Sequence, residues 1–212
     1  MNWLENLHAA RVHPRRIRVL AAAAARLLPP GAHVLDIGCG DGLMAATLAA
    51  LRPDISIVGV EVAPRSGCHI SVTAFDGRRV PFPDGSFDAV LLVDVLHHTV
   101  DPSVLLREAA RVARQAVLLK DHARTGLGAG PTLRFMDGMG NRRHGVALPY
   151  NYLSPSAWTA LFSACGLVVE TRDPLPTLYP FPANLIFGRD LHFFARLRPP
   201  LPSIGGLPSY PR

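Results

Sequence analysis

Short apolar runs bounded by turn residues recur along the chain and predict seven strands. They cover residues 33–37, 55–60, 69–75, 89–95, 116–120, 167–171 and 192–197. The run at 89–95 is almost continuously apolar, which is typical of a strand buried on both faces of a sheet. Apolar positions spaced by three or four predict four helices between the strands. These helices cover residues 14–28, 43–51, 102–114 and 155–165.

The alternation of strands and helices predicts an α/β fold with a mainly parallel sheet. In such sheets ligands bind beyond the carboxyl ends of the strands, so the residues that follow each strand carry the functional information. The boundary residues agree with this pattern. Pro14 suits a first helical turn, Ser154 suits an N-cap and Gly166 suits a C-terminal stop.

The chain has 212 residues, which is enough for one domain with a substantial core. We expect a single domain over residues 1–198, with a helical cap at 1–28 and a substrate-loop insertion at 123–152. The stretch 199–212 is rich in Pro and Gly and is expected to form a flexible tail. Hydrophobic residues make up 49% of the chain and charged residues 18%, a composition typical of a globular protein.

The net charge of +6 raises the question of a nucleic-acid partner. The positive charge comes from scattered arginines, with Lys120 the only lysine, whereas surfaces that bind nucleic acid concentrate their charge on one face. The scattered distribution of the positive charge therefore argues against a nucleic-acid partner. Three separated cysteines without a CxxC pair argue against a disulfide framework or a zinc site and favour a reducing compartment. Because no apolar run is long enough to span a bilayer, we expect a cytoplasmic protein without a membrane span.

A Gly-rich turn follows the first predicted strand and is the sharpest feature of the chain. Gly38 and Gly40 lack the Cβ atoms that would block a tight turn and the approach of the backbone to a ligand. A nicotinamide-binding turn would place its third glycine at position 43, which is Leu43 here. Asp36 precedes the first glycine by two residues, a position that favours a ligand with ammonium and sulfonium groups over a pyrophosphate.

The segment 34–42 resembles motif I of the class I S-adenosylmethionine-dependent methyltransferases, in its Asp-x-Gly-x-Gly-x-Gly form. Later positions are similar to the same family. Glu61 follows the second strand, and Asp76 follows the third. Residues 96–98, which read Leu-His-His after the fourth strand, are similar to a signature of its small-molecule enzymes. The resemblance covers residues 14–122 well and the last two strands more loosely.

The resemblance implies a Rossmann-like, mostly parallel sheet of seven strands, with helices on both faces and the last strand antiparallel. It implies S-adenosylmethionine as the cofactor and S-adenosylhomocysteine as the product. The family residue at the position of Glu61 binds the cofactor ribose, and the one at Asp76 accepts a hydrogen bond from adenine. The cofactor residues that the resemblance implies are Asp36, Gly38, Cys39, Gly40, Glu61, Val62, Asp76, Gly77, Asp94 and Val95.

The chain departs from the family between the second and third strands. Only residues 62–67 separate them, where the family has a whole helix. This crossover is therefore expected to be a short loop that leaves one face of the sheet less covered. Another segment or a second subunit would shield that apolar face, so a homodimer is one way to cover it.

The acceptor is expected to lie near the histidines that follow the fourth strand. We expect one of His97 and His98 to be structural and favour His98 as the one that faces the acceptor. Asp121 and His122 follow the fifth strand and are expected at the rim of the same crevice. The residues expected in catalysis are His98, His97, Asp121 and His144. The residues expected to bind substrate are His122, Arg134, Tyr150 and Tyr152.

The sequence thus predicts an enzyme that transfers a methyl group from S-adenosylmethionine to a small molecule by direct displacement. The acceptor atom stays open among oxygen, nitrogen and carbon, of which oxygen usually needs a base. No metal is expected, because Asp121, Asp137 and Asn141 lack a diagnostic spacing for Mg²⁺. Two alternatives stay open: a methyltransferase that acts on RNA or protein, and a non-catalytic protein that keeps the fold as a binding scaffold.

Overall fold

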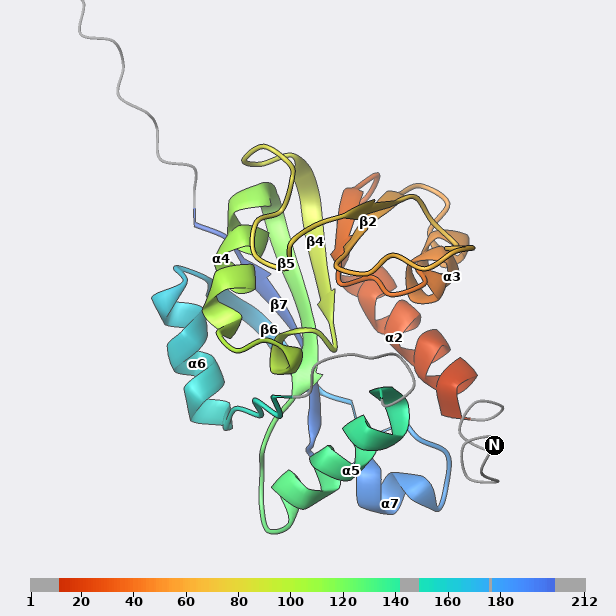
Figure 1. The fold of residues 1–212 in the computed structure, drawn as a ribbon, viewed down its shortest axis with the longest axis vertical. Helices are drawn as coiled ribbons and strands as arrows, with labels where there is room; N and C mark the ends of the chain where they lie inside the picture. Colours follow the sequence, from red (N-terminus) through yellow and green to blue (C-terminus); the bar gives the residue numbers. More distant parts are fainter. Residues whose placement is uncertain (1–11, 142–148, 176, 201–212) are drawn as a thin grey trace, which may run out of the picture.

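The computed structural model describes residues 12–141, 149–175 and 177–200, with the backbone alone at 140 and 141. Seven strands form one sheet (Figure 1). They are β1 (His33–Ile37), β2 (Ser56–Glu61), β3 (Val72–Ala74), β4 (Phe87–Val93), β5 (Ala113–His122), β6 (Val168–Pro174) and β7 (His192–Arg198). The parts of the expected cap and tail at 1–11 and 201–212 lie outside the described residues.

The strands follow the order β3-β2-β1-β4-β5-β7-β6 across the sheet. Neighbours from β3 to β5 run parallel, whereas β7 runs antiparallel to both β5 and β6. The predicted Rossmann-like sheet with an antiparallel last strand is therefore confirmed. The order reverses between β1 and β4, which is where open α/β sheets bind ligands.

Helices cover both faces of the sheet. Those in the described residues are α2 (His13–Leu27), α3 (Leu43–Leu51), α4 (Pro102–Val112), α5 (Ala129–Asn141), α6 (Pro155–Ala164) and α7 (Ala183–Phe187), with a 3-10 turn η2 (Leu96–His98). In Figure 1, α4 and α6 lie on one side of the sheet, and α2 and α3 lie on the other. The helices α5 and α7 lie beyond the carboxyl ends of the central strands. None of the described helices combines the length and the apolar character needed to cross a bilayer.

The apolar side chains of the central strands alternate between the two helical layers. Leu91 and Leu118 belong to the core that includes residues of α2 and α3, whereas Leu92 and Leu119 belong to the core with α4 and α6. All four side chains are 0% exposed. Full burial of a leucine contributes about 1.5–3 kcal/mol, so this two-sided packing fixes the register of the strands that carry the site.

The central strands end differently from the prediction at the edge that forms the site. β4 stops at Val93 rather than at residue 95, because Asp94 adopts a positive φ of 58° and the chain turns into η2. In contrast, β5 continues to His122 and pairs with β7 from Val117 to His122. Asp121 therefore lies within a buried strand, not in a loop at the rim of a crevice.

Two helices are missing from the prediction. The sequence predicts a structureless insertion after β5, but this segment contains α5, and α7 lies between β6 and β7. Gly130, Gly138 and Pro131 lower the helix propensity of α5, which explains why its pattern is hard to detect. The connection between β2 and β3 contains no helix, as the short spacing predicts.

Trp158 attaches α6 to the end of β5. Its indole N–H donates to the carbonyl oxygen of His122 at 2.8 Å, and the side chain is 1% exposed. We expect Trp158→Phe to lower the free energy of unfolding by about 2–3 kcal/mol, because it removes a buried hydrogen bond and ring volume. Urea denaturation followed by circular dichroism measures the loss. Thr159→Ala, at an exposed position of the same helix, should cost less than about 0.5 kcal/mol, and equal losses would contradict this account.

Candidate active site

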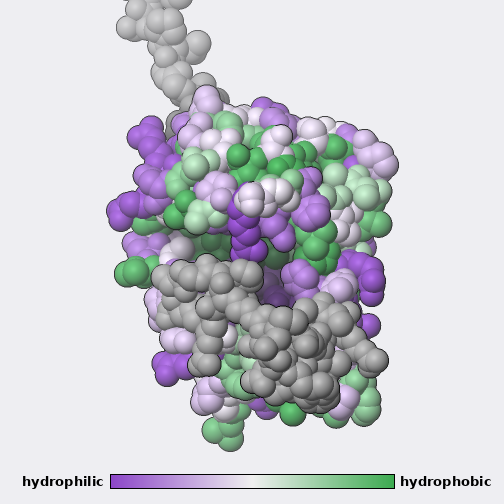
Figure 2. All heavy atoms as spheres, turned by 45° about the vertical axis from the view of Figure 1, so that its right-hand side comes forward, coloured by the Kyte–Doolittle hydropathy of each residue, from purple (hydrophilic) through white to green (hydrophobic). Residues whose placement is uncertain are grey.

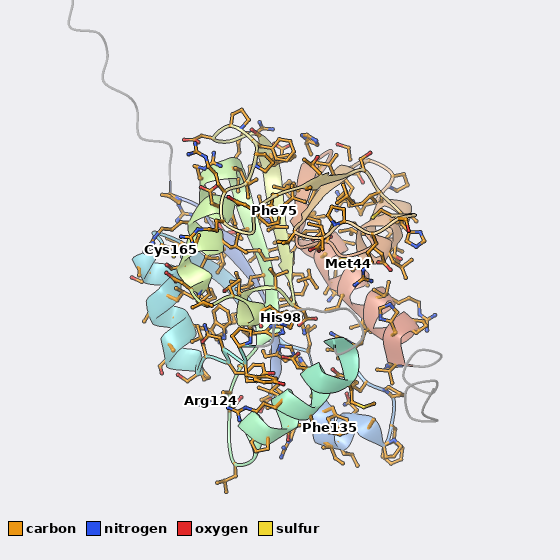
Figure 3. All side chains as sticks on the ribbon, in the orientation of Figure 1. Met44, Phe75, His98, Arg124, Phe135 and Cys165 are labelled. Atoms are coloured by element: carbon orange, nitrogen blue, oxygen red, sulfur yellow. The ribbon has the colours of Figure 1, made fainter. Side chains whose placement is uncertain are left out.

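The carboxyl ends of the central strands open onto a cleft of about 570 Å³. Residues of α2, α5 and α7 line it together with the loop after β1. Figure 2 shows hydrophilic side chains around a hollow in the middle of one face. Met44 of α3, His98 of η2 and Phe135 of α5 all line this cleft, and Figure 3 shows His98 near the centre of the molecule.

The loop after β1 forms one end of the cleft. Gly38 has a φ of +72° and donates its N–H to the carbonyl oxygen of Val60 at 2.8 Å. A Cβ atom on Gly38 would lie 2.7 Å from the side chain of Val95. Gly40 has a φ of +60° with open space on its Cβ side, and its N–H donates to Oε2 of Glu61 at 2.9 Å. Gly38 is thus required for close packing, and Gly40 for the turn itself.

Asp36 is the buried carboxylate of this end of the cleft. Its side chain lines the cleft, and the residue is 3% exposed. Burial, and secondly the charge of Glu61, raise the pKa of Asp36 to about 7. Within the described residues its carboxylate forms no hydrogen bond or ion pair. A buried, unpaired carboxylate that faces a cleft suits a cationic group of a ligand, which is what S-adenosylmethionine carries.

Glu61 and Asp76 lie at the ends of β2 and β3, beside the cleft. Each carboxylate accepts hydrogen bonds from two backbone N–H groups. At Asp76 these bonds lower the pKa of the carboxyl group. The expected cofactor residues that do not line the cleft are Glu61, Val62, Asp76, Gly77 and Val95. Their assignment to the ribose and adenine therefore stays a prediction.

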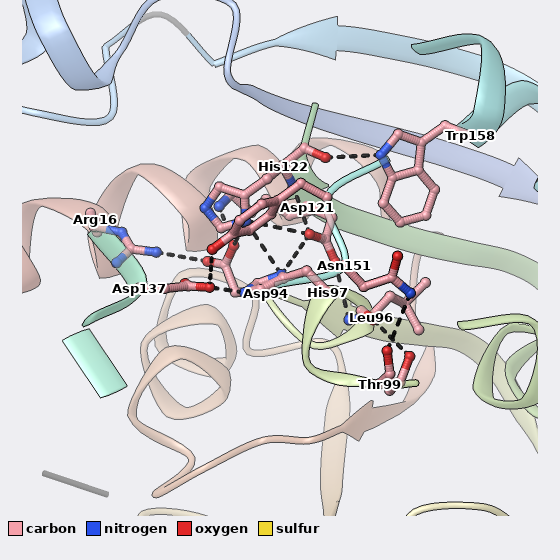
Figure 4. Close-up of polar contacts among 12 residues, drawn as sticks. Arg16, Asp94, Leu96, His97, Thr99, Asp121, His122, Asp137, Asn151 and Trp158 are labelled. Carbon is pink, nitrogen blue, oxygen red and sulfur yellow. Dashed lines mark hydrogen bonds and ion pairs between the residues drawn. The ribbon is translucent and has the colours of Figure 1, made fainter. Parts of the chain in front are cut away.

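A chain of one buried and two half-buried charged groups crosses the floor of the cleft (Figure 4). Lys120 is 0% exposed, and its ammonium group donates to Asp94. Arg16 of α2 donates to the other oxygen of Asp94 at 2.7 Å. Burial lowers the pKa of Lys120. Burial alone would raise the pKa of Asp94, but the charges of Lys120 and Arg16 hold it well below its usual range.

His97 lies between two carboxylates and is 1% exposed. Its Nδ1 is 2.7 Å from Oδ1 of Asp121, and its Nε2 is 3.4 Å from Oδ1 of Asp137. Burial opposes the charged imidazolium, but these carboxylates raise the pKa of His97 to about 10. Asp137 also accepts a hydrogen bond from the hydroxyl group of Tyr152. In the absence of a metal ion, these two carboxylates therefore favour the charged form of His97.

His98 is the half-buried member of the histidine pair, and its ring lies 4.0 Å from that of His97, between centroids. Burial, and secondly the charge of His97, lower the pKa of His98. His122 is 4% exposed, and burial together with Lys120 lowers its pKa to about 4. Asp121 does not lie at the rim of the cleft as the sequence predicts, because the extension of β5 buries it, and His122 is buried as well. His122 nevertheless lines the cleft.

Three of the expected substrate residues line a different cavity. Arg134 and Tyr150 border a hollow of about 370 Å³, where the guanidinium carbon lies 5.4 Å from the tyrosine ring centroid. Tyr152 borders this hollow too and reaches Asp137 in the wall of the main cleft with its hydroxyl group. His144 lies outside the described residues.

The structure also brings residues into the cleft that the sequence analysis does not assign to the site. These are the cation Arg16, the acid Asp137 and a group of mostly apolar side chains from α5, α7 and the segment before α7. This group consists of Phe135, Met136, Met139, Tyr179, Ala183 and Phe187. Lys120 lies beneath the cleft floor. The sequence contains one signal for this buried position, because a lone lysine in an otherwise apolar strand needs a buried partner.

The fold is an α/β sheet with a ligand cleft at the carboxyl ends of its central strands. Comparisons with known proteins show which proteins this chain is similar to. Residues 35–119 match the family described as "Methyltransferase domain". The S-adenosylmethionine-dependent methyltransferase from Aquifex aeolicus has a similar fold, with a TM-score of 0.60 and 17% identity over 87% of this chain and 93% of that one. This likeness supports the Rossmann-like methyltransferase fold.

Curated relatives agree with this assignment. The 27-O-demethylrifamycin SV methyltransferase of Amycolatopsis mediterranei is 31% identical over 53% of this chain and 48% of its own length. The ubiquinone biosynthesis O-methyltransferase of Xanthomonas oryzae pv. oryzae is 35% identical over 51% of this chain and 47% of its own length. The matched region thus spans about half the length of these relatives. The matched part of this chain is thus similar to methyltransferases in sequence as well as in fold.

The buried ion pairs predict an order of stabilities. Asp94→Asn leaves both Lys120 and Arg16 without their carboxylate, so we expect a loss of about 3–5 kcal/mol in the free energy of unfolding. Lys120→Met removes the buried charge and leaves Asp94 paired with Arg16, so the loss should be less than half as large. Urea denaturation of both variants measures the difference. A larger loss for Lys120→Met would show that Asp94 is not held by the two cations together.

Proposed function

We propose that this protein transfers the methyl group of S-adenosylmethionine to an oxygen atom of a small, partly apolar acceptor. One observation carries the proposal: a single cleft connects Asp36 and the Gly38–Gly40 turn with His98 and Asp137. The names of two relatives, a ubiquinone biosynthesis O-methyltransferase and a 27-O-demethylrifamycin SV methyltransferase, favour oxygen as the acceptor atom. This proposal goes beyond the matched domain, because it concerns the whole chain and its acceptor.

The cofactor end of the cleft is the part nearest β1. Asp36 would bind a cationic group of the methionine moiety, and the backbone at Gly40 leaves space for the ligand to approach closely. When bound, S-adenosylmethionine supplies a methyl group that its sulfonium already activates. The residues of the chain therefore only have to hold the cofactor, align the acceptor and exclude water.

The acceptor end combines a polar floor with an apolar wall. Phe135 and Phe187 stack with their ring centroids 6.0 Å apart, and both line the cleft. His98 and Asp137 contribute polar groups to the same cleft. This combination suits a hydroxyl group on an apolar ring, which binds by its ring to the wall and by its oxygen to the floor. We assign the contact with the acceptor oxygen to His98.

The charge state of Asp36 predicts how cofactor affinity depends on pH. Its pKa of about 7 means that about nine-tenths of the carboxyl groups are protonated at pH 6 and about one-tenth at pH 8. Since a cationic ligand binds the ionised form, the affinity advantage of the wild type over Asp36→Asn should grow about tenfold from pH 6 to pH 8. Calorimetric titration with S-adenosylmethionine measures both proteins.

The comparison with Asp36→Asn is designed to cancel the ionisation of the ligand itself, which is common to both proteins. Asp173→Asn serves as the control, because Asp173 is exposed on β6 at the far edge of the sheet. It should bind like the wild type at each pH. A wild-type advantage that stays constant from pH 6 to pH 8 would exclude Asp36 as the cation-binding group.

The acceptor assignment predicts a selective loss in His98→Gln. We expect methyl transfer to fall by about 10²–10⁴-fold, while the dissociation constant for S-adenosylmethionine changes less than about twofold. Transfer of a radiolabelled methyl group to a panel of phenols, catechols, hydroxyquinones and amines measures this. His33→Gln is the matched control, because His33 begins β1 at the opposite end of the sheet.

The same panel tests the acceptor class. Methylation of hydroxyl compounds by the wild type is the expected result. Transfer to amines alone, or to none of the compounds but to added RNA or protein, would contradict the proposal. Unchanged turnover in His98→Gln would remove His98 from the acceptor site.

A further inference from the structure

We propose that His97, His98 and Asp137 hold a divalent metal ion of the zinc type at the acceptor end of the cleft. The two histidines come from η2 and the carboxylate from α5, about forty residues later in the chain. One ligand atom from each residue lies within 4.8 Å of the other two. All three residues line the cleft.

The separation of His97 and Asp137 fits a shared metal ion better than a hydrogen bond. Nε2 of His97 lies 3.4 Å from Oδ1 of Asp137, beyond the 2.7–3.2 Å of an N–H···O bond. Two ligand atoms that are each about 2.1 Å from a tetrahedral zinc ion are about 3.4 Å apart. Moreover, this Nε2 atom is buried and has no hydrogen-bond partner within the described residues.

His97 and Asp137 each form a hydrogen bond with a neighbouring side chain, as metal ligands in proteins usually do. Asp121 binds Nδ1 of His97 at 2.7 Å, which places the proton on Nδ1 and leaves the lone pair of Nε2 facing Asp137. The Asp121 carboxylate is itself fixed by the N–H groups of Leu96 and His122. The second oxygen of Asp137 accepts a hydrogen bond from Tyr152. His97 and Asp137 thus each have an orienting partner.

Three protein ligands leave a fourth position open toward the cleft, which is the arrangement of catalytic rather than structural zinc sites. Two imidazoles and one carboxylate favour zinc over magnesium, because magnesium prefers oxygen ligands alone. Methyl transfer changes no oxidation state of a metal, so a redox-inert ion is sufficient.

The consequence for the reaction rests on the proposed function. An acceptor hydroxyl in the open position would have a lower pKa, as a zinc-bound water does. Its O–H bond breaks and the proton leaves to water. The oxygen then forms a bond to the methyl carbon as the bond from that carbon to sulfur breaks, which leaves a neutral thioether. His98 would then act as a ligand and not as the proton acceptor.

The test uses the full chain after treatment with a chelator, titrated with Zn²⁺ by calorimetry and with Co²⁺ by visible absorption. We expect one equivalent of each ion to bind and the intense absorption of tetrahedral cobalt to appear. Asp137→Asn and His98→Gln should each weaken binding by at least about 100-fold. Asp121→Asn should weaken it by about 10–100-fold, because Asp121 only orients His97. Asp84→Asn and His33→Gln are controls remote from the cleft and should bind like the wild type.

The wild-type titrations test whether the protein binds one metal ion, even if a variant fails to fold. Absence of stoichiometric binding would overturn the proposal and leave His97 as an imidazolium between two carboxylates. Binding that persists in both Asp137→Asn and His98→Gln would also overturn it, since the metal would then lie elsewhere. Metal binding by a protein that methylates no hydroxyl compound would support the site and overturn the proposed function. Full methyl transfer by metal-free protein would overturn the part of the metal ion in the reaction and leave the proposed function standing.

Discussion

The fully buried ammonium group of Lys120 is the constraint on which the site depends. A charge in the middle strand of a core is tolerated only with a carboxylate beside it, and Asp94 provides that carboxylate. Asp94 reaches this position because the chain leaves β4 with a positive φ, which also starts η2. The pairing of one buried lysine thereby determines where the next residues, His97 and His98, enter the cleft. Arg16 completes the pairing and ties α2 to the same point.

The second polar connection holds α5 in place. This helix contacts the sheet region through Asp137, which faces His97 and accepts a hydrogen bond from Tyr152. On its other side Phe135 stacks on Phe187 of α7. The apolar wall of the cleft is therefore positioned by a polar contact at its base. A change at His97 would therefore disturb the position of this wall through Asp137.

The turn after β1 could be predicted from the sequence because its determinants are local. The turn at Gly38 and Gly40 is required by backbone geometry within a few residues, and strand burial shows as continuous apolar runs. The acceptor end could be predicted only in part. His98 could be picked out from the sequence by its position after β4. Asp137 could not, because it lies on a glycine-containing helix whose apolar pattern is weak. Its contact with His97 joins residues forty positions apart, which no local pattern encodes.

For the proposed function, this division between local and distant determinants means that the fold can keep its cofactor while its acceptor changes. The loop after β1 is set by glycine geometry and by a single acid, so it tolerates little change. The apolar wall of the cleft belongs to the segments that follow β5 and β6, and a few side chains connect these segments to the sheet. Such segments can exchange their apolar residues without disturbing the strands. What they cannot exchange freely is Asp137, because a buried His97 would then lose the group that balances its second ring nitrogen. Acceptor chemistry and the attachment of the wall are therefore properties of the same residue.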